Sequence, residues 1–122
     1  MIYFIGAGPG AADLITVKGK DLLEKADLII YAGSLVNPEL LKYAKPECVI
    51  MDSAKMTLEE VIAAMVPAAQ AGKLVVRLHT GDPSVYGAHR EQIDLLRSYN
   101  LDFEIVPGVS SFCAAAACLD AE

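Results

Sequence analysis

The sequence predicts an α/β protein whose mostly parallel sheet is covered by helices on both faces. The first observation is that five short apolar segments alternate along the chain with segments of helical pattern. The second is that residues 74–79, an apolar run interrupted by Arg77, are typical of a strand that is buried on both faces. This alternation also implies right-handed crossovers between parallel strands.

The predicted elements can be placed along the chain in order. The predicted strands are residues 2–5, 27–31, 48–51, 74–79 and 103–106. The predicted helices are residues 17–25, a short one from 38 to about 44, a long one from 58, one over about 85–98, and 112–119. The last of these is almost wholly apolar, so we expect it to be buried on most sides.

Residue types at the helix starts support the first two helices. Thr16 is placed to cap the first helix, although Gly19 weakens that helix by roughly 1 kcal/mol relative to alanine. Asn37, Pro38 and Glu39 have the pattern of a cap, a proline at the first helical position and a first-turn acid. These signals predict where the helices begin more sharply than where they end.

The long helix has signals at both of its ends. Thr57 is followed three residues later by Glu60, which is the pattern of a capping box. Pro67 is expected to kink this helix or divide it just before the proline, because proline lacks the amide hydrogen that a helix interior uses. Gly72 fits the position directly after the helix. The following helix is expected to end near Asn100.

The composition favours a folded, cytoplasmic protein that does not bind nucleic acid. The chain has 122 residues, of which 54% are hydrophobic, and this suits one domain with a substantial core. A net charge of −6 argues against sequence-independent nucleic-acid binding, which depends on many contacts from Lys and Arg to phosphate. No apolar run reaches the ~18 residues of a membrane helix, and the first residues lack the basic region of a secretory signal.

The cysteines predict neither a disulfide framework nor a metal site. Cys48, Cys113 and Cys118 are odd in number and show no metal-ligand spacing, so we expect reduced structural thiols, as in the cytosol. A catalytic role is disfavoured because Cys113 and Cys118 lie in an alanine-rich apolar run, where a thiol behaves as a small hydrophobic group.

A glycine-rich loop, residues 6–10 (GAGPG), follows the first predicted strand. It departs from the dinucleotide-binding fingerprint, because Ala11 stands where the third glycine belongs and Pro9 lacks an amide hydrogen for a phosphate. Ala32 stands where an acid would hold a ribose, so an enzyme that uses a nicotinamide cofactor is disfavoured. Two interpretations stay open: a sharp turn that lets the next helix pack closely, and a wall along which a flat ligand approaches the backbone.

The turns after the fourth and fifth strands are also glycine-bearing. Residues 80–83 (TGDP) stop the fourth strand, and Ser84 can cap the helix that follows. Residues 107–111 (PGVSS) offer two hydroxyls and free amides at a helix start, or simple capping by Ser110. Because the carboxyl ends of parallel strands share one edge of the sheet, the three turns together predict a small-molecule crevice there.

Four titratable residues are candidates for functional groups. His79 is either an acid–base group or a polar residue at the end of a strand, whereas His89 fits a solvated helix residue better. Arg77 and Arg90 can meet substrate carboxylates, although surface ion pairing is favoured for each. Neither a Ser–His–Asp constellation nor a cluster of metal ligands is legible, so no catalytic residue is nominated and no metal is expected.

The ordered set of motifs resembles the N-terminal domain of the tetrapyrrole methylases, which use S-adenosylmethionine in corrinoid and sirohaem synthesis. The matching segments are residues 5–10, 14–19, 26–31, 81–83 with 86–87, and 106–111. Residues 31–36 (YAGSLV) are most similar to the branch that methylates C11 of a corrin precursor, with or without cobalt. In the uroporphyrinogen-methylating relatives a proposed base follows the tyrosine of the second strand. Ala32 stands there in this chain, so neither that base nor uroporphyrinogen is carried over.

The resemblance implies the strand order 3-2-4-1-5 and the cofactor S-adenosylmethionine, which leaves as S-adenosylhomocysteine. The implied cofactor-binding residues are Pro9, Thr80, Gly81, Asp82, Val85, Ser110 and Ser111. The implied substrate-binding residues, which border the tetrapyrrole, are Gly6, Gly8, Gly10, Tyr31 and Ser34.

The resemblance also implies that residues 1–122 are one domain, with the family's second α/β domain absent and about half of the active site present. The isolated domain is then expected to be inactive and to bind the cofactor weakly, and the full-length protein to be a homodimer without nucleic-acid or membrane partners. The alternatives are another methylase of this fold, such as a ribosomal RNA ribose methylase or diphthine synthase, and a non-catalytic flavodoxin-like binding module.

Overall fold

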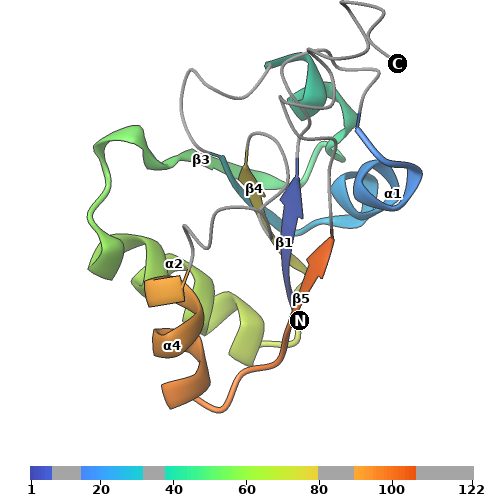
Figure 1. Cartoon of the computed structure of the whole chain (residues 1–122). Helices are drawn as coiled ribbons and strands as arrows, with labels where there is room; N and C mark the ends of the chain where they lie inside the picture. The colour runs from blue at the N-terminus through green and yellow to red at the C-terminus, as the bar shows by residue number, and fades with distance from the viewer. Residues whose placement is uncertain (7–14, 32–37, 80–89, 107–122) are drawn as a thin grey trace, which may run out of the picture.

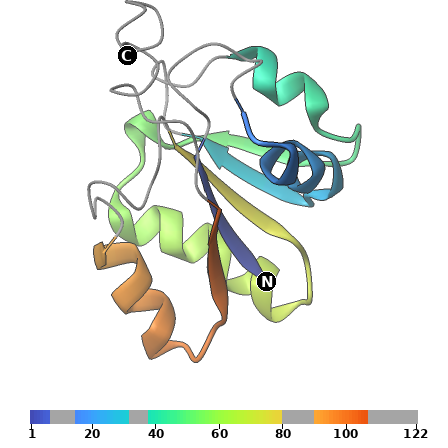
Figure 2. The same ribbon diagram turned by 45° about the vertical axis from the view of Figure 1, so that its right-hand side comes forward.

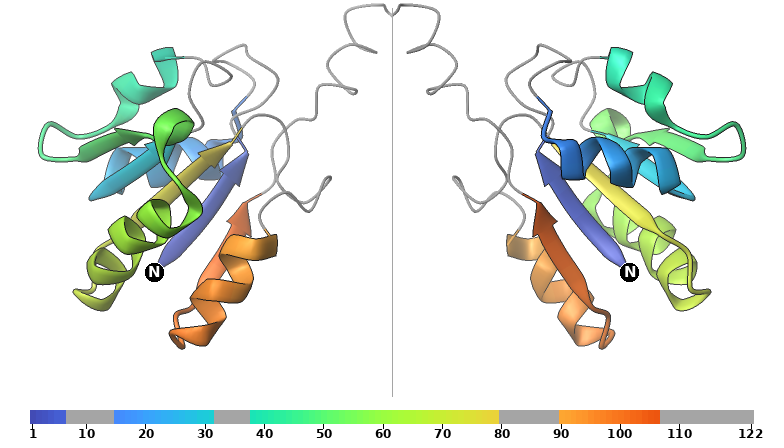
Figure 3. Two further views of the ribbon diagram at one scale, coloured as in Figure 1. Left: turned by 90° about the vertical axis from the view of Figure 1, so that its left-hand side faces the viewer. Right: turned by 90° about the vertical axis from the view of Figure 1, so that its right-hand side faces the viewer.

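Five parallel strands form one sheet in the order β3-β2-β4-β1-β5 in the computed structural model of the chain (Figure 1). The structure describes residues 1–6, 15–31, 38–79 and 90–106. The strands are β1 (Ile2–Gly6), β2 (Leu28–Tyr31), β3 (Val49–Asp52), β4 (Val75–His79) and β5 (Phe103–Val106). Every pair of neighbouring strands is parallel, so their carboxyl ends lie along one edge of the sheet (Figure 3). The predicted class and strand order are confirmed.

Helices cover both faces of the sheet, as predicted (Figure 2). On one face lie α1 (Val17–Lys25) and the 3-10 helix η3 (Pro38–Tyr43), and on the other lie α2 (Leu58–Gln70) and α4 (Arg90–Ser98). A further 3-10 helix, η4 (Ser53–Lys55), follows β3. The predicted helix over residues 112–119, and the first part of the one over 85–98, lie outside the described residues.

Two apolar cores stabilise this arrangement, because alternate residues of each strand point to opposite faces of the sheet. In β1, Phe4 faces α2 and α4 whereas Ile5 faces α1, and both side chains are fully buried. The core under α2 and α4 contains Ile2, Phe4, Leu28, Ile30, Val61, Ile62, Met65, Val66, Val75 and Leu96. The core under α1 and η3 contains Ile5, Leu23, Ala26, Ile29, Leu40, Val76, Leu78 and Val106. Burial of each large apolar side chain contributes ~1.5–3 kcal/mol.

The predicted starts of α1 and α2 are confirmed by their caps. Thr16 Oγ1 accepts the backbone N–H of Gly19 at 3.1 Å, and the helix begins at the next residue after Thr16. Thr57 and Glu60 form the predicted capping box. The Glu60 N–H donates to Thr57 Oγ1 at 3.2 Å, and the Thr57 N–H donates to Glu60 Oε1 at 3.4 Å.

Helix α2 continues through Pro67 to Gln70, so of the two expected effects of this proline, a kink or a division, the division does not occur. Proline removes one hydrogen bond of the helix, and the burial of the apolar face of α2 against the sheet outweighs that loss. The Pro67 carbonyl still accepts the N–H of Ala71 at 3.0 Å. Gly72 then ends the helix with φ +80°, and its N–H donates to the Ala69 carbonyl at 3.1 Å, as its predicted position requires.

Some element boundaries differ by a residue or two from the predictions. The short helix at Pro38–Tyr43 is a 3-10 helix, and the N–H of Ala44 donates to the Leu41 carbonyl at 3.2 Å in the same three-residue pattern. β3 begins at Val49 and includes Asp52, one residue later than expected at each end. Helix α4 ends at Ser98, and Asn100 has a positive φ of 57°, close to the predicted end.

Asp27 ties together the starts of three strands at the amino edge of the sheet. Its Oδ1 accepts from Lys45 Nζ at 2.7 Å, and its Oδ2 accepts from the backbone N–H of Leu74 at 2.9 Å. Its carbonyl accepts the N–H of Val49 at 3.0 Å. The hydrogen bond from Lys45, followed by that from Leu74, holds the pKa of Asp27 below its usual 3.8. Asp27 therefore fixes the edge opposite the predicted crevice.

Candidate binding site at the carboxyl edge of the sheet

β1 and β4 lie side by side, and the chain leaves them toward opposite faces of the sheet. After β1 it continues to α1 on one face, and after β4 it continues to α4 on the other face. In open α/β sheets, ligands bind in the crevice where neighbouring connections diverge in this way. Gly6 and His79, the last residues of these two strands, are register partners. The topology therefore locates the candidate site above this pair.

The three strands that precede the predicted turns end next to one another. β4, β1 and β5 are consecutive in the sheet and end at His79, Gly6 and Val106. The expectation that the three turns start from one edge is confirmed for the strand ends. The turns themselves lie outside the described residues.

Two of the predicted site residues fall within the described part of the chain. Gly6 is buried at the end of β1. Tyr31 is half-buried at the end of β2, and its side chain packs on the α1 side of the sheet. The other predicted site residues, which lie outside the described residues, are Gly8, Pro9, Gly10, Ser34, Thr80, Gly81, Asp82, Val85, Ser110 and Ser111.

His79 lies in an aromatic setting directly below the edge. It is 4% exposed, and its ring stacks on that of Phe4 with 6.0 Å between centroids and 4° between planes. Phe4 in turn meets Phe103 edge to face, at 6.1 Å and 87°. The imidazole is therefore held within the core under α2 and α4 rather than on an open strand end. The side chains of His89 and Arg90 lie outside the described part of the structure.

Arg77 lies in the core below the edge, so the favoured interpretation as a surface ion pair is wrong. It is 6% exposed, because β4 is the central strand and both of its faces are covered. Its Nη1 donates to the Ile30 carbonyl at 3.2 Å, and its Nε donates to Gln92 Oε1 at 3.3 Å. Burial lowers the pKa of Arg77 to about 10, which leaves the guanidinium charged at neutral pH. The sequence did carry a signal for this burial, because Arg77 lies between apolar residues of the predicted strand.

Ser53, the first residue of η4 after β3, contacts the end of β2. Its Oγ donates to the Tyr31 carbonyl at 3.0 Å. Asp52 Oδ1 accepts the N–H of Ala54 at 2.9 Å, and the Ser53 carbonyl accepts the N–H of Met56 at 3.1 Å. These two bonds fix the turn that carries the hydroxyl. Sequence reasoning missed Ser53, although the polar pair Asp52-Ser53, directly after the predicted strand 48–51, marks the same edge.

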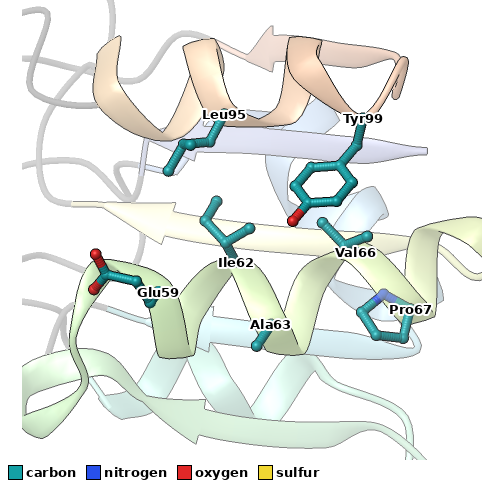
Figure 4. Close-up of a pocket in the computed structure, with 7 residues that line it drawn as sticks. All are labelled: Glu59, Ile62, Ala63, Val66, Pro67, Leu95 and Tyr99. Atoms are coloured by element: carbon teal, nitrogen blue, oxygen red, sulfur yellow. The ribbon is translucent and has the colours of Figure 1, made fainter.

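A separate apolar groove lies between α2 and α4, in the helical layer that covers the sheet (Figure 4). Its volume is about 370 Å³, and it is lined by Glu59, Ile62, Ala63, Val66, Pro67, Leu95 and Tyr99. Small-molecule sites usually combine an apolar lining with several converging polar groups. Here only Glu59 and Tyr99 carry polar groups, so this groove is not the candidate site.

The described residues hold neither a metal-binding cluster nor a helix that could span a membrane. Within residues 1–6, 15–31, 38–79 and 90–106, no group of three or more His, Cys, Asp or Glu side chains is arranged to hold a metal ion. No helix in the same part of the chain has the length and apolar character needed to cross a membrane. Cys48, the cysteine within these ranges, is a free thiol whose pKa is raised by burial.

Known proteins that are similar to this chain in sequence and fold are methyltransferases. The cobalt-precorrin-4 C(11)-methyltransferase of Methanocaldococcus jannaschii is 60% identical over 121 residues, which are 99% of this chain and 47% of that protein. The X-ray structure of a cobalt precorrin-4 methyltransferase, a cobalamin biosynthetic enzyme, matches with a TM-score of 0.95 and 52% identity over 99% of this chain and 51% of that one. A uroporphyrin-III C-methyl transferase from Thermus thermophilus, complexed with S-adenosylhomocysteine, matches with a TM-score of 0.77 and 35% identity over 94% of this chain and 47% of that one.

The fold and the strand ends define an α/β protein whose candidate small-molecule site lies at the switch point of its parallel sheet. More particularly, residues 1–122 match the Tetrapyrrole (Corrin/Porphyrin) Methylases, and the chain belongs to this family. It spans about half the length of the curated relatives that it matches. A flavodoxin-like sheet has the order 2-1-3-4-5, so the alternative of a flavodoxin-like module is wrong for this sheet of order β3-β2-β4-β1-β5.

Proposed function

We propose that the full-length protein transfers a methyl group from S-adenosylmethionine to C11 of cobalt-precorrin-4, in cobalamin biosynthesis. The observation that carries this proposal is the 60% identity to a cobalt-precorrin-4 C(11)-methyltransferase over 99% of the chain. The TM-score of 0.95 to a solved enzyme of the same activity supports it. Because the chain spans about half of these relatives, the activity is proposed for the full-length protein and not for residues 1–122 alone.

The described strand ends are compatible with a sulfonium cofactor. The last described residues of β4, β1 and β5 are His79, Gly6 and Val106, and none of them brings an ammonium or guanidinium group that would repel a sulfonium cation. A buried glycine at the switch point is compatible with close approach of a flat ligand to the backbone. The proposed cofactor-binding residues remain Pro9, Thr80, Gly81, Asp82, Val85, Ser110 and Ser111.

S-adenosylmethionine supplies a methyl group that is already activated, so C11 forms the new carbon–carbon bond as the methyl–sulfur bond breaks, and the ring later loses a proton. The residues of this chain then act mainly by alignment, which can supply much of the acceleration. Gly6, Gly8, Gly10, Tyr31 and Ser34 are proposed to border the tetrapyrrole. Asp82 is proposed to hydrogen-bond the cofactor, and no general base is nominated.

The decisive experiment incubates the full-length protein with cobalt-precorrin-4 and S-adenosylmethionine that carries an isotopically labelled methyl group. We expect the label at C11 by nuclear magnetic resonance, with one S-adenosylhomocysteine formed per methyl transferred. Metal-free precorrin-4 and uroporphyrinogen III are the comparison substrates. Label at another ring position, or turnover of uroporphyrinogen III alone, would refute the proposal.

We further propose that the full-length protein is a cytoplasmic homodimer, as the family resemblance implies. The free thiol of Cys48 is consistent with a reducing compartment. Light scattering of the full-length protein tests the dimer, and a mass equal to one chain would contradict it. Fractionation of the source cells tests the location, and recovery of the protein outside the cytoplasm would contradict it.

A further inference from the structure

Two side chains from opposite neighbours hold consecutive carbonyls at the end of β2. Arg77, on β4, donates to the carbonyl of Ile30 at 3.2 Å, and Ser53, just after β3, donates to the carbonyl of Tyr31 at 3.0 Å. β2 lies between β4 and β3, and successive carbonyls of a strand point to opposite neighbours. The last two residues of β2 are therefore held from both sides.

Both hydrogen bonds are at least partly buried, and a further residue orients the Arg77 side chain. The bond from Arg77 to Ile30 is buried, and the one from Ser53 to Tyr31 is partly buried. A charged donor in a low-dielectric setting makes a strong hydrogen bond. Gln92, in the first turn of α4, accepts from Arg77 Nε at 3.3 Å and so limits the freedom of the guanidinium.

The two hydrogen bonds lie at the part of the edge that is proposed to bind the tetrapyrrole. Tyr31 is the residue of β2 that is proposed to border the tetrapyrrole, whereas the proposed cofactor contacts follow β1, β4 and β5. Within the described part of the chain, the Ser53 side chain bonds to the β2 end of the edge. A binding group that is not held in its bound position must be ordered when the ligand binds, and this ordering weakens the affinity. Loosening of the Tyr31 backbone should therefore weaken binding of the tetrapyrrole and leave binding of the cofactor unchanged.

We propose that Ser53 and Arg77 are positioning residues that fix the end of β2, and with it Tyr31, for recognition of the tetrapyrrole. This inference rests on the proposed function in one respect, namely that the ligand beside Tyr31 is a tetrapyrrole. It differs from a general stabilising role because it predicts that one ligand is affected and the other is not.

The test uses the full-length protein and two equilibrium measurements. The Kd of a stable cobalt corrinoid with free carboxylates is measured by absorbance titration, and the Kd of S-adenosylhomocysteine by calorimetry. Ser53→Ala should weaken corrinoid binding about fivefold, as expected for one lost hydrogen bond, and change the Kd of S-adenosylhomocysteine less than twofold. Ser53→Thr keeps the hydroxyl and should restore the corrinoid Kd.

Ser98→Ala is the matched control. Its Oγ also donates to a backbone carbonyl, that of Leu95, but at the exposed far end of α4. It should leave both Kd values unchanged. Gln92→Ala is a second variant in case Ser53→Ala does not fold, and it should weaken corrinoid binding in the same direction, because Arg77 loses the acceptor of its Nε.

The outcomes separate this inference from the proposed function. Equal weakening of both ligands by Ser53→Ala, or an unchanged corrinoid Kd, would assign Ser53 to stability alone and overturn the inference. If the wild-type protein binds the corrinoid but transfers no methyl group to cobalt-precorrin-4, the proposed function fails and the inference is still judged on binding. If the wild-type protein does not bind the corrinoid, the inference fails, whereas the proposed function is judged separately by methyl transfer to cobalt-precorrin-4.

Discussion

Gly19→Ala tests how closely α1 is seated on β1. Gly19 lies in the first turn of α1 and is buried. Replacement of a helical glycine by alanine normally stabilises a protein by ~1 kcal/mol, because alanine has fewer unfolded conformations to lose. If helix propensity decided the result, the variant would be more stable than the wild type.

The packing around Gly19 predicts the opposite. A Cβ there would lie 3.0 Å from Ile5 Cγ2, 3.1 Å from Thr16 Oγ1 and 3.2 Å from Ile15 Cγ1. Carbon atoms pack best at ~3.5–4.0 Å. Ile5 is fully buried, so its side chain has little free space to move into, and Thr16 Oγ1 is the cap acceptor. Overpacking costs ~1–3 kcal/mol and a weakened cap ~0.5–2 kcal/mol. After the ~1 kcal/mol gain from alanine is subtracted, we expect a net destabilisation of about 0.5–4 kcal/mol.

Urea denaturation followed by circular dichroism measures this difference. The control is Asp21→Ala, an exposed position of the same helix, which should change the free energy of unfolding by less than ~0.5 kcal/mol. A Gly19→Ala protein with the stability of the wild type, or greater, would refute the reasoning. It would mean that α1 can move away from β1 without loss.

Three further predictions concern the core, the amino edge and the cofactor. Leu96→Ala should destabilise by ~2–5 kcal/mol and Leu95→Ala by less than ~1 kcal/mol, since their exposed fractions are 0% and 36%, and urea denaturation checks both. The pKa of Asp27 is lowered, so its contribution is present above pH 3.8 and is lost as the pH falls through the pKa of the folded state. Asp27→Asn should accordingly be less stable than wild type at pH 7, and this gap in denaturation midpoint should close below pH 3.8. Residues 1–122 alone should show weak or undetectable calorimetric binding of S-adenosylhomocysteine, and micromolar binding would contradict the view that they hold half of the site.

The fold was largely predictable because local signals and hydrophobic pattern agree along this chain. Thr16 and the Thr57–Glu60 pair mark helix starts that the structure reproduces. Phe103–Val106 is a strand with the predicted bounds. The strand order was predictable only through the family resemblance, since apolar strands of similar length carry little information about which neighbour they choose.

The misinterpretations have a common physical cause, which is that burial depends on tertiary context. Pro67 breaks a helix by local rules, yet here it lies in a last turn that the core holds in place. Arg77 is charged, and charged residues usually lie at the surface. It is buried here because β4 is the central strand, and acceptors on Ile30 and Gln92 satisfy two of its donors. The role of Ser53 depends on the pairing of β2 with β3, which no local pattern specifies.

The strand order places the proposed cofactor turns and the Tyr31 part of the tetrapyrrole border at different positions along the binding edge. The proposed cofactor turns follow β1, β4 and β5, and the glycines at the end of β1 are also proposed to border the tetrapyrrole, whereas β2 and β3 end at Tyr31 and Asp52 beyond β4. Arg77 lies on β4, the strand at the boundary, and bonds to β2 on one side and to Gln92 of α4 on the other. Among the described residues it thus links the proposed tetrapyrrole side with the helix that follows the proposed cofactor turn. A buried charge is costly unless its donors are satisfied. Separation of β2 or α4 from β4 would leave donors of Arg77 without acceptors, so this cost favours the observed arrangement of the three elements.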